Sequence, residues 1–452
     1  MTTAVRPLPG MAREYRFPRF ERHILDNGMQ VIVAAVRKLP VVSVLAVIDA
    51  GAASEAAGKE GIAELTAQSL REGTTERDGL QLTVDFEQLG TSLEAGADWD
   101  TSVVSMTLLR DSLTAAFDLF SDVLRSPALP ESGFERLRAE RLAERMQILS
   151  EPRGLADESF SRFVYGPSAR YQEPMSGSTE SISRISHADI QGFHSRNYTP
   201  DAVTMIIAGD LDVDEGIELV NKSFSSWKGE RKRIVQEADM RARSSRATEL
   251  VGKTGAAQSE LRIGHVGVPR LHPDYFNIVV MNAVLGGLFS SRINLNLREA
   301  HGYTYGASSY FDWRRGCGPF VISTAVESEV TGAAISEILG EIDKMQREEI
   351  SDEELTLATS YLGGVFPIRY ESTAAIASAL ATMVAFGLPG DYYDTYRERV
   401  RRVTTRDVLS AARKYVSADE LQLVVVGDPS KVRAPLEGLG IGPLSVRDAT
   451  ES

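Results

Sequence analysis

The chain carries the same helix-and-strand pattern twice, at a fixed separation. Segments 189–210 and 407–428 each start with an aspartate in an amphipathic helical pattern and end, 21 residues later, in the Gly-Asp that closes a short apolar strand. Two further pairs match at the same offset of 218 residues: Ile185 with Val403 and Ala116 with Ala334. Several matches at one offset are hard to obtain by chance, so we predict an internal duplication. Both halves must then share one architecture.

The order of elements within each half indicates the fold class. The first half predicts strands at 29–35, 41–50 and a strand pair within 93–109, with helices at 61–72, 112–125 and 131–150. The second half predicts strands at 259–266, 303–311 and 320–326, a helix at 273–285, and further helices after them. Runs of strands followed by helices are typical of α+β layers. We therefore predict two homologous α+β lobes, each a mostly antiparallel sheet with helices packed on it.

Composition shifts place the domain boundaries. The charged stretch 229–246 has no apolar periodicity and is interpreted as a linker. The predicted domains are an N-terminal tail (1–18), a first lobe (19–228), this linker, a second lobe (247–440) and a C-terminal tail (441–452).

Charge and composition limit the partners of the chain. The net charge of −14 repels both nucleic acid and anionic membranes, so neither is expected as a main partner. The apolar run 374–388 is shorter than the about 20 residues that span a bilayer, and is interpreted as a buried helix. The N-terminus shows arginines and prolines rather than a signal peptide, which favours a cytoplasmic location and leaves a transit peptide open. The one cysteine, Cys317, excludes an intrachain disulfide and a thiolate metal cluster.

The stretch 49–74, with its glycines and its helix, resembles the opening of the pitrilysin and mitochondrial-processing-peptidase family. The likeness covers nearly the whole chain and continues at Leu89-Gly90, Gly177-Ser178, Tyr198-Thr199-Pro200, Gly209-Asp210, and segments 286–292 and 297–306. The resemblance implies that the two lobes form half of a peptide chamber.

Active members of that family carry the motif H-x-x-E-H on this first helix. Residues four apart share a helical face and present two imidazoles to one Zn²⁺, while the glutamate serves as general base. In this sequence the three positions hold Glu64, Ala67 and Gln68. Ala67 cannot accept a proton, and the neutral amide of Gln68 is a poor zinc ligand. We therefore expect no zinc, and no other cofactor, on this chain.

The remaining histidines do not restore such a motif. No pair stands four residues apart among the six: His23, His187, His194, His265, His272 and His301. The resemblance places the third zinc ligand of the family near Glu144. Without imidazoles beside it, Glu144 is interpreted as a solvated charge on the helix 131–150.

Arg298 and Tyr305 occur in the second half, seven residues apart, in the context Leu-Arg-Glu-x-x-Gly-x-x-Tyr. The resemblance implies that such a pair faces the zinc across the chamber. A guanidinium can hold a peptide carbonyl or carboxylate, and a phenol can donate to a developing oxyanion. From the residues alone, a structural interpretation stands beside this one. Arg298 lies near a helix C-terminus before Gly302, and Tyr305 falls on one face of strand 303–311.

Some members of the family work as pairs, in which one subunit brings zinc and the other brings the Arg and Tyr. The resemblance therefore implies a zinc-less subunit that binds peptide and adds Arg298 and Tyr305 to an active site whose zinc lies on a partner subunit. The peptide would add to a sheet edge. Segment 93–97 resembles the family's substrate strand but lacks the usual Asn, so a plain half-buried strand is favoured. The alternatives are a non-enzymatic structural or interaction subunit, and a stand-alone peptide-binding homodimer.

Overall fold

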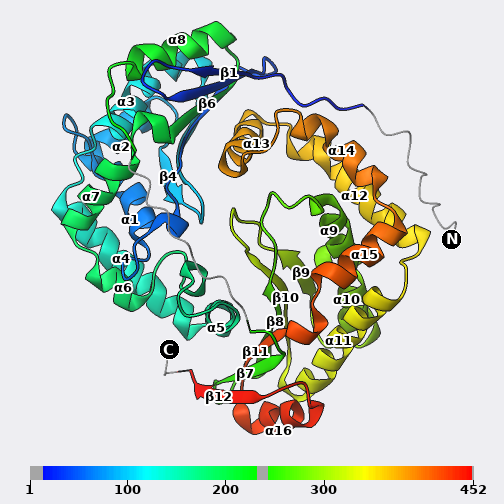
Figure 1. The fold of residues 1–452 in the computed structure, drawn as a ribbon. Helices are drawn as coiled ribbons and strands as arrows, with labels where there is room; N and C mark the ends of the chain where they lie inside the picture. The colour runs from blue at the N-terminus through cyan, green and yellow to red at the C-terminus, as the bar shows by residue number, and fades with distance from the viewer. Residues whose placement is uncertain (1–13, 232–242, 450–452) are drawn as a thin grey trace, which may run out of the picture.

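The computed structural model describes residues 14–231 and 243–449, and contains two six-stranded sheets (Figure 1). The first sheet has the order β1 (Glu21–Ile24), β2 (Gln30–Ala35), β6 (Val203–Gly209), β3 (Val41–Ile48), β5 (Ser102–Leu109), β4 (Glu94–Ala97). The second has the order β12 (Leu444–Asp448), β7 (Ala247–Gly252), β11 (Gln422–Gly427), β8 (Gln258–Val266), β10 (Pro319–Glu327), β9 (Ala307–Phe311). The shared order confirms two homologous α+β lobes.

Most neighbouring strands run antiparallel, as predicted. The parallel pairs are β2 with β6, β7 with β11, and β7 with β12. Helices α7 (His187–Asn197) and α15 (Thr405–Tyr415) begin and end at the predicted offset of 218 residues. Helices α3 (Leu113–Arg125) and α11 (Thr331–Arg347) also begin at that offset. The duplication is therefore one of structure as well as of sequence.

The other helices lie around the two sheets. In the first half they are α1 (Ile62–Ser69), α2 (Gly79–Gln88), α4 (Glu131–Ser150), α5 (Pro152–Val164), α6 (Thr179–Arg184) and α8 (Val213–Phe224). In the second half they are α9 (Tyr275–Asn282), α10 (Arg292–Asn294), α12 (Asp352–Arg369), α13 (Thr373–Phe386), α14 (Tyr392–Arg402) and α16 (Pro429–Leu439). Two π-helical turns, η6 (Ala283–Gly287) and η7 (Leu295–Ala300), follow α9 and α10.

Each lobe lends one helix to the sheet of the other lobe. Helix α13, from the second half, packs on β3 and β6 of the first sheet, and its Leu380 shares an apolar cluster with Ile32 and Ile206. Helix α5, from the first half, packs on β8 and β11, and its Phe160 lies in a cluster with Val424. Figure 1 shows this exchange, with α13 beside the first sheet and α5 beside the second. Both faces of the central strands are therefore covered, which explains why every residue of β6 and β11 is buried.

The structure differs from the predicted tails. Residues 444–448 form β12, which pairs with the outer edge of β7 in the place that β1 has in the first sheet. An edge strand of five residues is too short to show a clear alternation, so the sequence predicts a tail there. Near the N-terminus, Phe17 is buried and stacks on Tyr393 of the second half. Most of the predicted linker, 232–242, lies outside the described residues.

Two apolar helices belong to the core. The predicted buried helix at 374–388 is α13. The helical stretch Tyr275–Ala300 is long and apolar enough to cross a membrane by composition, but 56% of that apolar window is buried in the protein. Its Ile278, Val280 and Met281 lie in the core of the second lobe, which is where a globular protein places such a helix.

We predict that Leu380→Ala destabilises both lobes together. Leu380 is fully buried in the exchanged helix, so the cavity lowers the free energy of unfolding by about 2–5 kcal/mol. Urea unfolding of variants that keep only Trp227 or only Trp313 reports on the first and second lobes separately. Both transitions should shift to lower urea by the same amount. The control Leu357→Ala, at a half-exposed position on α12, should change stability by about 0.5 kcal/mol or less. A shift confined to one lobe contradicts the coupling.

Candidate functional site

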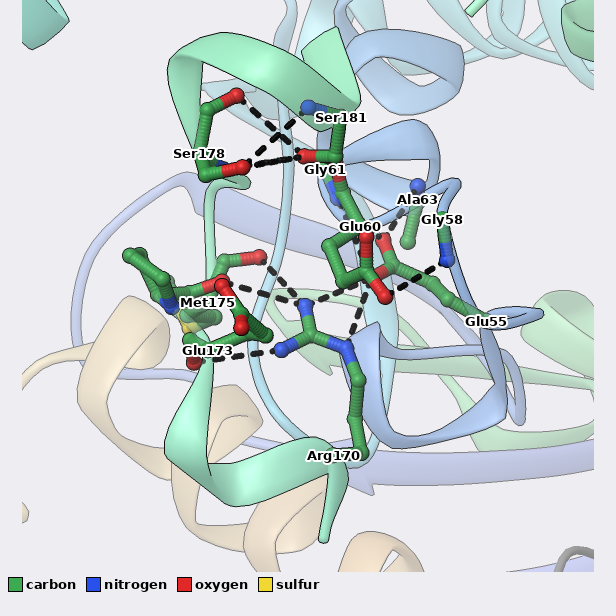
Figure 2. A network of polar contacts seen from close by, with 11 residues as sticks. Glu55, Gly58, Glu60, Gly61, Ala63, Arg170, Glu173, Met175, Ser178 and Ser181 are labelled. Atoms are coloured by element: carbon green, nitrogen blue, oxygen red, sulfur yellow. Dashed lines mark hydrogen bonds and ion pairs between the residues drawn. The ribbon is translucent and has the colours of Figure 1, made fainter. Parts of the chain in front are cut away.

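A buried ion pair fixes the start of α1, the helix that carries the degenerate zinc-motif positions (Figure 2). The Glu55 carboxylate accepts hydrogen bonds from the backbone N–H of Gly61 and Ala63, at 3.1 and 2.8 Å, so it supplies the helix cap from six residues upstream. Gly61 has φ +97°, and a Cβ there would lie 2.5 Å from the Ser176 carbonyl oxygen. Only glycine therefore suits this position.

Arg170 holds the other side of the Glu55 carboxylate. Its Nε and Nη2 atoms lie 3.1 and 2.6 Å from Glu55 Oε2, and it also donates to the carbonyl oxygens of Glu173, Pro174 and Met175. Burial raises the pKa of Glu55 to about 7, while the Arg170 guanidinium and the helix amides act in the opposite direction. Removing either partner would leave an uncompensated buried charge, so the pair holds α1 in one place.

Of the three motif positions on α1, the two polar ones bond within the chain and the third is a buried alanine. Glu64 Oε1 accepts from Gln68 Nε2 at 2.8 Å, and Glu64 Oε2 accepts from the Ala97 backbone N–H at 2.6 Å. Ala67 is fully buried. The Gln68 amide nitrogen, which is a hydrogen-bond donor and not a metal ligand, thus points toward Glu64. Sequence reasoning places these residues on one face of the helix but does not show that they satisfy one another.

Arg141 of α4 joins two of the positions that the family resemblance assigns to zinc ligands. Its Nη2 lies 3.3 Å from Glu64 Oε1, and its Nη1 lies 2.8 Å from Glu144 Oε2. Glu144 is 57% exposed, as expected for a solvated charge, but it is ion-paired. Across residues 14–231 and 243–449, no group of three metal-ligating side chains comes together. With a guanidinium between the two carboxylates, these residues do not fit a zinc ion, because the charge repels the metal and the ligand oxygens are engaged.

Within segment 93–97, residues 94–97 form β4, at the edge of the first sheet. Ala95, Gly96 and Ala97 are half-buried, in line with the favoured interpretation of the segment. In the turn that follows, the Asp98 N–H points toward β5 and donates to the Thr101 carbonyl. By alternation along the strand, Ala97 N–H points to the free edge, where Glu64 accepts it. A side chain of this chain therefore occupies the bond that an added peptide strand would form at Ala97.

Arg298 lies in the π-helical turn η7, and its guanidinium stacks on an aromatic ring. The Cζ atom is 4.2 Å from the centroid of Phe289, and the nearest carboxylate, that of Glu299, is 3.5 Å from Nη2. The buried Nη1 donates no hydrogen bond within the described part of the chain. π-helical turns are frequent at functional sites. The guanidinium thus keeps donor capacity for a ligand.

Tyr305 is 94% exposed. The predicted strand 303–311 starts only at Ala307, and Tyr305 lies in the loop between Gly302 (φ +67°) and β9. The apolar alternation of 303–311 thus starts before the strand itself does. The interpretation of Tyr305 as a packed residue on a strand face is therefore wrong. Its side chain borders a cleft of about 720 Å³, which Phe289 and Tyr310 also line. Phe289 thus links the two residues: its ring supports the Arg298 guanidinium, and it lines the same cleft as Tyr305.

Comparisons with known proteins agree with this picture. Residues 31–168 match the family described as insulinase (peptidase family M16), and residues 184–362 match the one described as peptidase M16 inactive domain. An uncharacterized zinc protease of Mycobacterium tuberculosis is 24% identical over 401 residues, which are 88% of this chain and 90% of that protein. A non-peptidase homolog of Helicobacter pylori is 20% identical and covers 82% of this chain and 85% of its own.

A solved structure shows the same fold. The crystal structure of a peptidase M16 inactive domain from Pseudomonas fluorescens superposes with a TM-score of 0.84 and 25% identity, over 91% of this chain and 98% of that one. At this coverage the likeness extends through both lobes.

We predict that zinc binding cannot be restored at α1 by the motif alone. The triple variant Glu64→His, Ala67→Glu, Gln68→His supplies both imidazoles, yet Arg141 still places a positive charge beside them and holds Glu144. Adding Arg141→Leu should tighten zinc binding at least about tenfold, since it removes that repulsion and frees the third ligand. Calorimetric titration with zinc measures the difference. The matched control adds Arg136→Leu in place of Arg141→Leu. Arg136 and Arg141 line one cleft beside α1, but Arg136 pairs with Glu72 and Glu140. Equal affinity with and without Arg141 would show that the guanidinium does not block the site.

Proposed function

Because this chain belongs to the M16 family of peptidases, we propose that it is the zinc-less subunit of a two-subunit metallopeptidase. In this proposal the chain binds peptide and contributes Arg298 and Tyr305 to an active site completed by a zinc-bearing subunit of the same family. The chain forms half of the peptide chamber, and the partner forms the other half.

The contrast between the two candidate sites carries the proposal. At α1, the Glu64 carboxylate accepts hydrogen bonds from both Gln68 and Arg141. In the second lobe, Tyr305 extends into solvent and Arg298 Nη1 has no hydrogen-bond acceptor among the described residues. An exposed phenol, and a partly exposed guanidinium that stacks on an exposed aromatic ring, are typical of groups that meet a ligand. The polar groups at α1 thus bond within the chain, whereas Tyr305 and Arg298 keep donors for a ligand.

The strand next to Tyr305 suits peptide binding. β9 follows the Tyr305 loop and lies at the edge of the second sheet, paired with β10 on one side. An extended peptide can add to such an edge by main-chain hydrogen bonds. A peptide placed there would run past the cleft that Tyr305, Phe289 and Tyr310 line.

The roles of the two side chains follow from their chemistry. The Arg298 guanidinium would hold a carbonyl or carboxylate of the peptide and fix its position. The Tyr305 hydroxyl would donate to the oxyanion that develops on the scissile carbonyl, where a preorganised donor lowers the barrier. Zinc on the partner would supply the Lewis-acid chemistry that activates water for hydrolysis.

Reconstitution tests the proposal. Co-expressed with a zinc-bearing relative, such as one encoded beside it, the chain should yield a complex that cleaves peptides. Tyr305→Phe should lower kcat about 10²–10³-fold, since it removes one oxyanion donor. Arg298→Ala should lower kcat/KM by at least about tenfold. Peptide-cleavage kinetics give both values, and gel filtration checks that the complex still forms.

Matched controls remove a tyrosine hydroxyl and an arginine elsewhere. Tyr361→Phe on α12 and Arg347→Ala on α11 change exposed side chains away from the cleft and should leave cleavage unchanged. Full activity of the Tyr305 and Arg298 variants would favour a structural subunit, and peptide binding without a partner would favour the homodimer. Chelator-sensitive cleavage by this chain alone would overturn the proposal.

A further inference from the structure

A buried asparagine lies between the segments that carry Arg298 and Tyr305. Asn294, in α10, is 2% exposed and ends in a polar amide. Its Nδ2 donates to the Phe289 carbonyl oxygen at 2.5 Å, and its Oδ1 accepts from the Ala307 backbone N–H at 3.0 Å. A buried amide is stabilised only when its donor and acceptor are both used. In Asn294 the donor is used on the side of Arg298 and the acceptor on the side of Tyr305.

On the donor side, Asn294 holds the backbone of the residue that supports Arg298. The Phe289 ring is 72% exposed and carries the Arg298 guanidinium 4.2 Å from its centroid. A large apolar ring exposed to this degree has few packing contacts of its own. The hydrogen bond to the Phe289 carbonyl therefore limits where the ring, and with it the guanidinium, can lie.

On the acceptor side, Asn294 holds the end of the Tyr305 loop. Ala307 is the first residue of β9, two residues after Tyr305. The other end of the loop is tied by Thr304, whose hydroxyl donates to the Gly306 carbonyl at 2.9 Å and accepts from Thr324 Oγ1 at 3.0 Å. The loop backbone is thus fixed on both sides of Tyr305, while the Tyr305 side chain stays exposed.

We propose that Asn294 is a positioning residue that sets the placement of Arg298 relative to Tyr305. The proposal rests on the function proposed above. Asn294 acts through Phe289 and Ala307 and does not itself have to touch the peptide. Preorganisation of this kind matters because a displacement of about 1 Å at a reacting group can cost about 10²-fold in rate.

The test uses the reconstituted two-subunit complex and measures kcat and KM separately. Asn294→Leu keeps the size of the side chain and removes both hydrogen bonds. It should lower kcat/KM about 10- to 100-fold, mainly through kcat. Asn294→Ala removes the same two hydrogen bonds without adding an apolar branch, so it should also lower kcat/KM mainly through kcat. The Ala variant serves as the test if the Leu variant does not fold.

A matched control exists in the first lobe. Asn27 also uses both ends of its amide: its Nδ2 donates to the Phe224 carbonyl at 2.8 Å, and its Oδ1 accepts from the Met29 N–H at 3.2 Å. It lies in the lobe that carries neither Arg298 nor Tyr305. Asn27→Leu should therefore leave kcat/KM of the assembled complex within about twofold, which is inside the scatter expected for an uncoupled site.

A double-mutant cycle separates positioning from plain structural damage. If Asn294 acts by placing the pair, Asn294→Leu should cost little more once Tyr305→Phe is present, so the two losses do not add. Fully additive losses would overturn this inference alone. The same holds if the Asn294 variants stay within about twofold of wild type while Arg298→Ala and Tyr305→Phe are inactive. Active Arg298→Ala and Tyr305→Phe variants would instead overturn the proposed function.

Discussion

The reciprocal packing of α5 and α13 is the interaction on which the rest of the structure depends. Each helix leaves its own half and covers the second face of the other sheet. The two lobes therefore share their cores, and burial of apolar surface on both sides opposes their separation. Contacts at the 312–318 turn depend on this arrangement. Arg314 stacks 4.0 Å from Trp99 and 4.5 Å from Tyr171, and Arg315 N–H donates to Asp100 at 3.0 Å. The hairpin of β9 and β10 is thus anchored to the turn between β4 and β5 of the first lobe.

The two lobes differ in how far the polar side chains of their candidate sites are bonded within the chain. In the first lobe the Glu64 carboxylate is hydrogen-bonded within the chain, because it accepts from Gln68, Ala97 and Arg141 at once. Any ligand there would first have to break those bonds, which costs free energy that the ligand must restore. The second lobe instead keeps Tyr305 exposed and stacks Arg298 on a ring. The duplication thus gives two related faces: Glu64 on the first is engaged by three groups of the chain, whereas Tyr305 on the second is exposed to a ligand.

Much of this could be predicted from the sequence, because it depends on local pattern. The repeat at 218 residues predicts the common sheet order, and Glu64, Ala67 and Gln68 are visible as a departure from a spaced motif. Contacts between distant segments could not be predicted in the same way. The apolar composition of α13 does not say which sheet it covers, and nothing in the spacing points to Arg141, 77 positions after Glu64. The alternation of 303–311 predicts a strand at Tyr305, but strand pairing with β10 begins only at Ala307. Asn294 gives no signal either, since its role depends on two backbone groups that the fold brings to it.

The central claim is that Tyr305 faces a metal held by another subunit. Fluorotyrosine placed at position 305, in a complex whose partner carries paramagnetic cobalt in place of zinc, measures this directly. The account predicts that the ¹⁹F resonance of residue 305 broadens with cobalt and not with zinc, while fluorotyrosine at the buried Tyr415 of α15 is much less affected. A sharp resonance at position 305 in a fully assembled cobalt complex would contradict the account.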